Sequence, residues 1–498
     1  MRLRLARSLT IPAAALAALG LLACGSSGSS AESTPDAPTT VSAPDAGTPP
    51  ARAAKRLTDW PMFGLTPSRP SATNASPGIG AGTLKRLQRT RVTTPGTVDS
   101  TPIILGDTAF ATTTYGKTVA VDLASGKIRW TFTPKEFQRV AGSPQITNAS
   151  PAADPSRRFV FTASPGGFIH KLSVADGAEQ HGWPVSITRD ATHEKLTSSL
   201  NVSGRRVIAT TGGYIGDEPP YQGKVVTLDR RSGRVIGVWN SLCANRHRVI
   251  VPSSCSSTES AIWGRAGAVV LPGSRDLLVA TSNGPFDGAT DWGDSVLRLS
   301  PDARRLLRHW TPTEQARYEA QDIDVGSTSP AFLGHDLVLQ GGKDAKLHLI
   351  ALSRMAGVTG AAGRRLGGDL QVLPTPGGQM MFTAPAVWHH RGGTTVFVTT
   401  GGGTTAYRVL KRRIKPLWAN GHAGTSPIVA GGLLYVYDPS GGGLRVYHAG
   451  TGRLAATLPA GSGHWNSPVA AGGRIVLGEG NANDHDSDHG VLDIWSER

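Results

Sequence analysis

The sequence predicts an all-β protein, a single eight-bladed β-propeller of four-stranded antiparallel blades, and two observations support this fold. First, a segment of the type Ser/Thr-x-Pro, or a variant of it, recurs eight times, each time followed by a β-rich run, glycines and a second β-rich run. Second, these segments are spaced by about 41 to 66 residues, and periods near this length built from short strands are typical of propeller blades. A blade buries its faces only against its neighbours, so the repeats are expected to form one domain.

The blades are expected to begin at Ser100-Thr101-Pro102, Ala149-Ser150-Pro151, Ser198-Ser199-Leu200, Ile262-Trp263-Gly264, Ser329-Pro330, Thr383-Ala384-Pro385, Thr425-Ser426-Pro427 and Asn466-Ser467-Pro468. The first blade has the clearest pattern, with four expected strands over 103–105, 108–113, 118–122 and 128–132. Each run is short, rich in β-branched or aromatic residues, and closed by Gly or Asp, as strands in tight hairpins are.

The N-terminal region predicts export and a lipid anchor. Residues 1–23 carry three arginines and then an apolar run from Ile11 to Leu22, which is typical of a signal peptide and too short for a membrane span. The sequence Leu-Leu-Ala-Cys-Gly that ends at Gly25 is similar to a bacterial lipobox, in which Cys24 becomes the acylated first residue. The alternative is an ordinary signal peptide cut elsewhere. Residues 24–56, rich in Ser, Ala, Pro and Thr, are expected to form a disordered tether, and 57–498 the propeller.

The remaining cysteines, Cys243 and Cys255, form an even pair in a chain that is expected to be exported. We therefore expect a disulfide between them, with a stabilisation of about 3 kcal/mol from loop closure. No CxxCH motif is present, so the chain has no attachment site for covalent haem.

The formal net charge is +15, which raises the question of nucleic-acid binding. The arginines are scattered through expected blade turns, and no nucleic-acid motif is present. With an extracytoplasmic, lipid-anchored location, attraction to anionic envelope polymers or lipid headgroups is the better expectation.

The stretch from Tyr115 to Phe132 resembles the repeat of the pyrroloquinoline quinone (PQQ) propeller superfamily. The segment 59–64, continued through 84–87, is similar to the lead-in of quinoproteins. The resemblance implies that 88–93 is the strand that closes the ring against the last blade, near 491–495.

The resemblance leaves two classes of function open. Quinoprotein dehydrogenases hold PQQ and Ca²⁺ on the propeller axis and oxidise an alcohol, polyol or sugar hydroxyl. Other members are cofactor-free binding or scaffold propellers, among them a lipoprotein of outer-membrane protein assembly, and engage envelope proteins or glycans. Fold alone cannot choose between these classes, so the choice depends on particular residues.

Two residues are candidates for binding PQQ. The resemblance places Trp263 where dehydrogenases have the tryptophan under the cofactor, and an indole offers a large, rigid stacking face. It places Lys343 at the quinone oxygens, where a cation stabilises developing negative charge. The alternatives are a tryptophan that packs between blades and a solvated turn lysine.

Three further residues are candidates for metal binding and proton transfer. Asn283 matches a turn asparagine whose amide oxygen is a Ca²⁺ ligand in the family. Asp322 and Asp324 fall where the family carries its catalytic aspartate, a general base for a substrate hydroxyl. Strand alternation would put both carboxylates on one face. The alternatives are a turn asparagine and loop aspartates that bond to backbone.

One departure counts against a quinoprotein site. Where calcium quinoproteins have a glutamate ligand, this chain has Tyr214, and a phenol is a poor ligand for a hard cation. Asp217 or Glu218 would have to reach the metal instead. The acidic and histidine-rich run at 481–489 is expected to be an exposed hairpin loop rather than a metal site.

Overall fold

A computed structural model describes residues 56–497 of the chain. The expected signal peptide, Cys24 and nearly all of the expected tether lie outside these residues, so lipidation stays a prediction. Within residues 56–497 no helix is long and apolar enough to cross a membrane.

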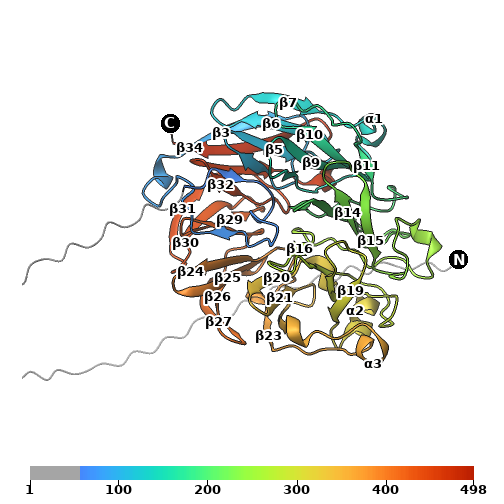
Figure 1. Ribbon diagram of the computed structural model, residues 1–498. Coiled ribbons are helices and arrows are strands. Elements are labelled where there is room, and N and C mark those ends of the chain that lie inside the picture. The colour runs from blue at the N-terminus through green and yellow to red at the C-terminus, as the bar shows by residue number, and fades with distance from the viewer. Residues whose placement is uncertain (1–55, 498) are drawn as a thin grey trace, which may run out of the picture. The chain divides into compact units, whose positions relative to one another are not determined.

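The described residues form eight antiparallel sheets arranged in a ring, which confirms the eight-bladed propeller (Figure 1). In Figure 1 the blades follow one another around the ring, from the blue N-terminal strands through green and orange to the red C-terminal ones. Each blade has four strands of its own, and two blades gain an extra short strand from the lead-in segment.

The strands are listed here by blade. Blade 1 contains β4 (Ile103–Leu105), β5 (Thr108–Thr112), β6 (Thr118–Asp122) and β7 (Ile128–Phe132). Blade 2 contains β8 (Ala152–Ala153), β9 (Phe159–Ser164), β10 (Phe168–Ser173) and β11 (Val185–Ser186). Blade 3 contains β12 (Asn201–Ser203), β13 (Arg206–Thr210), β14 (Lys224–Asp229) and β15 (Val235–Asn240). Blade 4 contains β16 (Val269–Val270), β17 (Leu277–Ala280), β18 (Val296–Leu299) and β19 (Leu306–Trp310).

The second half of the ring follows the same plan. Blade 5 contains β20 (Ala331–Gly334), β21 (Leu337–Gly341), β22 (Lys346–Ala351) and β23 (Gln371–Pro374). Blade 6 contains β24 (Ala386–His390), β25 (Gly393–Thr400), β26 (Gly403–Val409) and β27 (Ile414–Asn420). Blade 7 contains β28 (Ile428–Ala430), β29 (Leu433–Asp438), β30 (Gly443–His448) and β31 (Leu454–Leu458). Blade 8 contains β32 (Val469–Ala471), β33 (Arg474–Glu479), β34 (Gly490–Ser496) and β3 (Gln88–Thr94).

The recurring segments mark the blade starts well. In seven of the eight blades the first strand begins directly after the segment, and in blade 4 it begins at Val269, a few residues later. The first strand of blade 1 is fully buried, whereas the last one, β7, is largely exposed. The first strands therefore face the ring axis and the last strands face outward.

The ring closes between the two ends of the folded chain. Strand β3 pairs along its whole length with β34, with Arg89 opposite Trp495 and Thr93 opposite Val491. This register confirms the expected closing strand. The blue β3 and the red β34 lie side by side in Figure 1.

The lead-in segment, residues 56–78, fills the axial channel. Its strand β1 (Asp59–Trp60) pairs with β4, and β2 (Ala72–Thr73) pairs with β28. Backbone hydrogen bonds from the segment also reach blades 2, 4, 6 and 8. Phe63 and Arg69 are buried between the blades, with only 2% and 4% of their surfaces exposed. The lead-in thus fastens the inner strands of most blades to one another.

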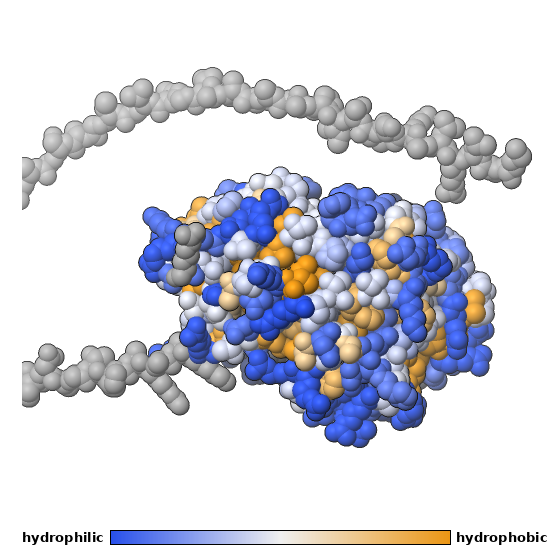
Figure 2. Space-filling view, turned by 90° about the horizontal axis from the view of Figure 1, so that it is seen from above, coloured by the Kyte–Doolittle hydropathy of each residue, from blue (hydrophilic) through white to orange (hydrophobic). Residues whose placement is uncertain are grey.

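Helices are few and short: α1 (Phe137–Val140), α2 (Gln315–Gln321), α3 (Gly360–Gly363), and the 3-10 turns η1 (Leu84–Arg86), η2 (Pro252–Ser254), η3 (Val325–Ser327), η4 (Leu352–Arg354), η5 (Pro376–Gly378) and η6 (Ala482–Asp484). The expected disulfide joins Cys243 and Cys255, 12 residues apart. The run at 481–489 is a loop between β33 and β34, as expected. In Figure 2 hydrophilic residues dominate the side of the ring that is seen, and hydrophobic residues form small patches among them.

Candidate functional site

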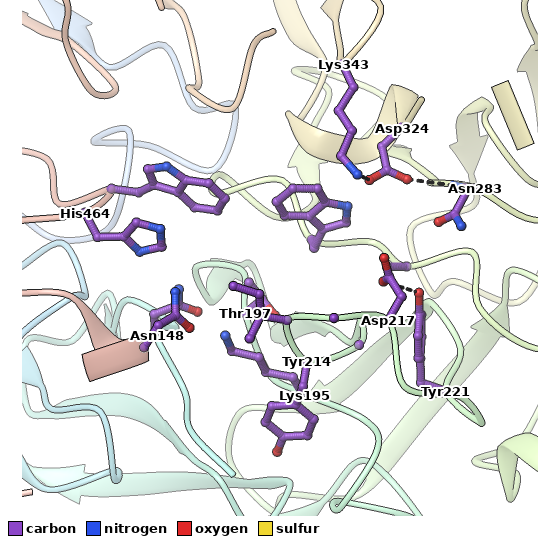
Figure 3. Close-up of a pocket in the computed structure, with 17 residues that line it drawn as sticks. Asn148, Lys195, Thr197, Tyr214, Asp217, Tyr221, Asn283, Asp324, Lys343 and His464 are labelled. Carbon is purple, nitrogen blue, oxygen red and sulfur yellow. Dashed lines mark hydrogen bonds and ion pairs between the residues drawn. The ribbon is translucent and has the colours of Figure 1, made fainter. Parts of the chain in front are cut away.

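A cavity of about 220 Å³ lies on the ring axis, among the loops that precede the first strands of the blades. Trp263, Asn283, Asp324 and Lys343 all line it, so four of the five residues that the sequence proposed for the chemistry converge (Figure 3). The fifth, Asp322, does not line it. The lead-in approaches the axis elsewhere, where Asp59 bonds to the β4–β5 turn, and none of its residues lines the cavity.

Aromatic side chains form one wall of this cavity. The indole of Trp263 lies 5.6 Å from that of Trp465, with 28° between their planes, and 6.0 Å from the ring of Phe382. The indole N–H of Trp263 donates to Ser282 Oγ at 2.6 Å, which fixes the plane of its ring. A third ring could fit between Trp263 and Trp465 only if their planes were about 7 Å apart, because each of its faces needs a carbon contact of about 3.5 Å. The two rings are closer than that, with 5.6 Å between their centroids. A flat ligand can therefore use only the open faces of this wall.

Lys343 joins the two candidate aspartates. Its Nζ lies 2.6 Å from Asp324 Oδ2 and 2.8 Å from Asp322 Oδ1. The expectation that both aspartates share one face of a strand is wrong. Asp322 ends α2 in the left-handed region, with φ of 54°, and Asp324 precedes η3. The helix end turns the Asp322 carboxylate outward, where half of the side chain is exposed, while Asp324 points into the cavity.

Burial and charge set the protonation of these carboxyl groups. Burial raises the pKa of Asp324, and Lys343 together with the backbone N–H of Asn283 partly offsets the rise. Nearby, Asp294 is fully buried, and burial and the Asp324 charge raise its pKa well above the ordinary value. Burial therefore disfavours a charge on both groups, and the Lys343 ammonium stabilises the charged form of Asp324.

Asn283 is placed less favourably for a metal than the resemblance implies. Its backbone N–H donates to Asp324 Oδ1 at 2.9 Å, and its amide nitrogen lies 3.3 Å from Glu259 Oε2. The neighbouring carboxylates raise the pKa of Glu259, after burial as the main cause. No group of three or more Cys, His, Asp or Glu side chains in residues 56–497 is arranged to hold a metal ion.

The position of the family's glutamate ligand does not supply a replacement. Tyr214 lines the cavity, but its hydroxyl donates to the carbonyl of Ala191 at 2.9 Å. Burial raises the pKa of this phenol far above its ordinary value, so it stays neutral. Asp217 does line the cavity and accepts a hydrogen bond from Tyr221 at 2.8 Å, whereas Glu218 is exposed and turned away. Asp217 and Asp324 line the same cavity as Asn283, but Asp324 is paired with Lys343, and no three such acidic, His or Cys side chains in residues 56–497 are arranged to hold a metal. This donor set therefore does not fit Ca²⁺.

The fit to PQQ is partial. An open indole face on Trp263 and the Lys343 ammonium, 5.8 Å from that ring, suit a planar anion. That ammonium is already held by two carboxylates, and the metal that would bind the quinone from the other side has no ligand set.

Sequence reasoning missed part of the site. Lys195, Asn148, His464 and Trp465 also line the cavity. A signal for three of them was present, because Asn148, Trp465 and His464 stand directly before a recurring blade-start segment, where the chain turns towards the axis. Lys195 stands three residues before its segment and follows the same rule less strictly.

The comparisons with known proteins agree with this architecture. The family described as outer membrane protein assembly factor BamB matches residues 83–249. No curated protein matches the chain in sequence. The eight-bladed ring and the family match over residues 83–249 agree with the resemblance to the PQQ-like propeller superfamily.

Solved structures with the same fold come from both functional classes. The chain is similar to a quinohemoprotein alcohol dehydrogenase from Comamonas testosteroni, at 15% identity and a TM-score of 0.65 over 89% of this chain and 81% of that one. It is similar to a europium-containing methanol dehydrogenase, at 14% identity and a TM-score of 0.65 over 88% and 98%. It is also similar to BamB from Moraxella catarrhalis, at 14% identity and a TM-score of 0.50 over 82% and 98%. At these identities the likeness establishes the fold alone.

Proposed function

We propose that the chain is a binding propeller of the cell envelope, whose axial cavity holds a small polar molecule without a calcium-bound quinone. One observation carries this proposal: the carboxylate of Asp324, the candidate general base, is paired with Lys343 at 2.6 Å, and this internal cation weakens it as a base. Tyr214, bonded to a backbone carbonyl, stands where the family has its metal-binding glutamate.

The chemistry of the cavity supports ligand binding. Its wall offers the apolar face of Trp263, and Asp217 and Asn283 present polar groups to the same space. A cavity with an apolar wall and a few fixed polar groups is the usual form of a small-molecule site.

A second candidate is oxidation of an alcohol, polyol or sugar hydroxyl with PQQ. The observation that favours it is the convergence of Trp263, Asn283, Asp324 and Lys343 in the order that the resemblance implies. The similarity to proteins named as alcohol and methanol dehydrogenases is consistent with it.

A calorimetric titration separates the two candidates. PQQ is titrated into the protein with Ca²⁺, with Eu³⁺, and with neither metal, using Lys343→Ala and the exposed-turn control Lys127→Ala. The binding proposal predicts no metal-dependent PQQ binding in any of the three proteins. Micromolar PQQ binding that requires a metal, is lost in Lys343→Ala and is kept in Lys127→Ala would overturn the binding proposal in favour of the dehydrogenase.

The envelope location of this proposal rests on the lipobox at Cys24. An acyl chain there would anchor the propeller to the membrane, and the similarity to BamB supports envelope proteins or glycans as further partners. The test is detergent-phase partitioning of the full chain expressed in a bacterium that processes lipoproteins. The wild type is expected in the detergent phase and Cys24→Ser in the aqueous phase. Aqueous partitioning of both would overturn the anchor.

A further inference from the structure

Lys195 is a buried lysine without a partner in the described part of the chain. Only 6% of its surface is exposed, and that part lines the axial cavity. Its backbone exchanges two hydrogen bonds with Gly212, at 2.8 and 2.9 Å, which hold its Cα in place. Its Nζ makes no hydrogen bond or ion pair within residues 56–497, although a buried ammonium normally needs one.

Asp99 is the buried carboxylate whose charge acts on Lys195, but it does not pair with the amine. Asp99 Oδ2 lies 2.9 Å from His464 Nδ1 and accepts the backbone N–H of Ala482 at 3.1 Å, whereas Oδ1 accepts no hydrogen bond within residues 56–497 and lies 3.7 Å from the guanidinium of Arg265. Burial lowers the pKa of Lys195 to about 8, with Asp99 raising it and Arg265 lowering it. The ammonium therefore keeps an unmet need for a negative partner.

Two other lysines of this fold have carboxylate partners. Lys224 is fully buried, and its ammonium is paired with the fully buried carboxylate of Glu194. The other lysine of the cavity, Lys343, is held by two aspartates. Lys195 differs from both, because its amine lies beside the cavity and the Tyr214 ring, 6.0 Å away, and not beside a carboxylate that pairs with it.

The two ends of the cavity differ in charge. In Figure 3 Lys195 lies with Asn148 and His464 on one side, and Asp324, its partner Lys343, Asn283 and Asp217 lie on the other. His464 engages Asp99 through Nδ1, so the Lys195 ammonium is the group at its end that can donate to an anion. One end thus suits an oxyanion, and the other suits hydroxyl groups, which can donate to carboxylates.

We propose that Lys195 is an anion subsite, so that the natural ligand is a small hydroxylated acid, such as a sugar acid, with its oxyanion at Lys195 and its hydroxyls towards Asp324. This inference rests on the proposed binding role and specifies the chemical class of the ligand. An acid group at Lys195 fixes the direction of the ligand, and its apolar face lies along Trp263.

The test follows the Lys195 amine by NMR in protein with isotopically labelled lysine, the signal being assigned by its loss in Lys195→Met. Acetate, glucuronate and the neutral control glucose are added to the free protein. An oxyanion at the amine favours its charged form, so both acids should raise the apparent pKa by about 1 unit or more, and glucose should not.

Affinity measurements on variants complete the test. Lys195→Met should weaken glucuronate binding at least about tenfold without changing glucose binding, and the matched surface variant Lys127→Met should bind both as the wild type does. An amine that responds to neither acid, or a Lys195→Met variant that binds glucuronate normally, would overturn the subsite. Metal-dependent PQQ binding would instead overturn the binding role, while the amine response to acetate would still decide the subsite separately.

Discussion

The ammonium of Lys343 is held between Asp324 and Asp322, and the two aspartates differ greatly in burial, with 5% and 52% of their side chains exposed. Removing the cation leaves the Asp324 carboxylate buried without its partner, and a broken buried pair costs several kcal/mol. We expect Lys343→Met to lower the free energy of unfolding by about 2–3 kcal/mol, and Asp322→Asn by less than about 0.5 kcal/mol.

Denaturant unfolding at pH 7 measures these differences. The double variant Lys343→Met with Asp324→Asn should recover most of the loss, since it removes the stranded charge as well. An equal loss in the single and double variants would mean that Lys343 stabilises the fold through packing of its stem.

The pKa of Lys195 predicts how the affinity for an oxyanion changes with pH. Its pKa of about 8 in the fold lies below the ordinary value of about 10.4, because burial, and the Arg265 charge to a lesser extent, disfavour the ammonium. Asp99 opposes this, and the Tyr214 ring, 6.0 Å away, also faces the amine. Oxyanion affinity should therefore fall as pH rises above about 8, approaching tenfold per unit, and this step should be absent in Lys195→Met.

The charged form of Lys195 also lowers the free energy of unfolding below about pH 8. Between about pH 8 and 10.4 the unfolded chain binds a proton at Lys195 that the folded chain does not, so this contribution to stability rises with pH. Below pH 8 the buried charge costs stability in full. Lys195→Met should therefore raise the melting temperature at pH 7, measured by differential scanning fluorimetry, and a lowered value would show a structural ion pair.

Strand β3 joins the start of the ring to its end, and its arginines pair with carboxylates on the other strands of blade 8. Arg89 bonds to Glu479 at 2.5 Å and to Asp493 at 2.6 Å, and these carboxylates are 6% and 0% exposed. Arg86, just before the strand, pairs with Glu497 on the surface. We expect Arg89→Met to cost about 3 kcal/mol of unfolding free energy and Arg86→Met less than about 1 kcal/mol. Similar losses in both variants, in urea unfolding, would contradict a special role for the closing strand.

The repeat of the blades could be predicted from the sequence, but the directions of single side chains could not. The blade starts follow from the repeat spacing, and the β3–β34 closure was implied by the resemblance to PQQ propellers. The direction of the Asp322 side chain depends on the left-handed end of α2, a local turn that no alternation pattern predicts. Lys195 escaped notice because an unpaired buried charge shows only when its surroundings are known. The clustering of Trp263, Asn283, Asp324 and Lys343 was predicted, but their pairing was not.

The lead-in segment is expected to make the ring unfold as one unit. Each blade buries its faces against two neighbours, and residues 56–78 add contacts along the axis that no blade supplies by itself. The buried Arg69 donates to the carbonyls of Phe63, Ser199 and Leu200, the last at 2.7 Å, and so ties the segment to blade 3.

Arg69→Met should therefore weaken the whole ring in a single transition. Burial lowers the pKa of Arg69 to about 9, and the variant removes this costly charge but strands three carbonyls that accept from it. We expect a net loss of about 2 kcal/mol, seen by calorimetry as one transition shifted down by roughly 2–4 °C. The control is Arg157→Met, which removes a surface ion pair to Asp59 on the same lead-in, 3.0 Å long, and should shift the transition by less than about 1 °C. Two separate transitions in Arg69→Met would mean that the blades unfold in groups and that the lead-in only fills space.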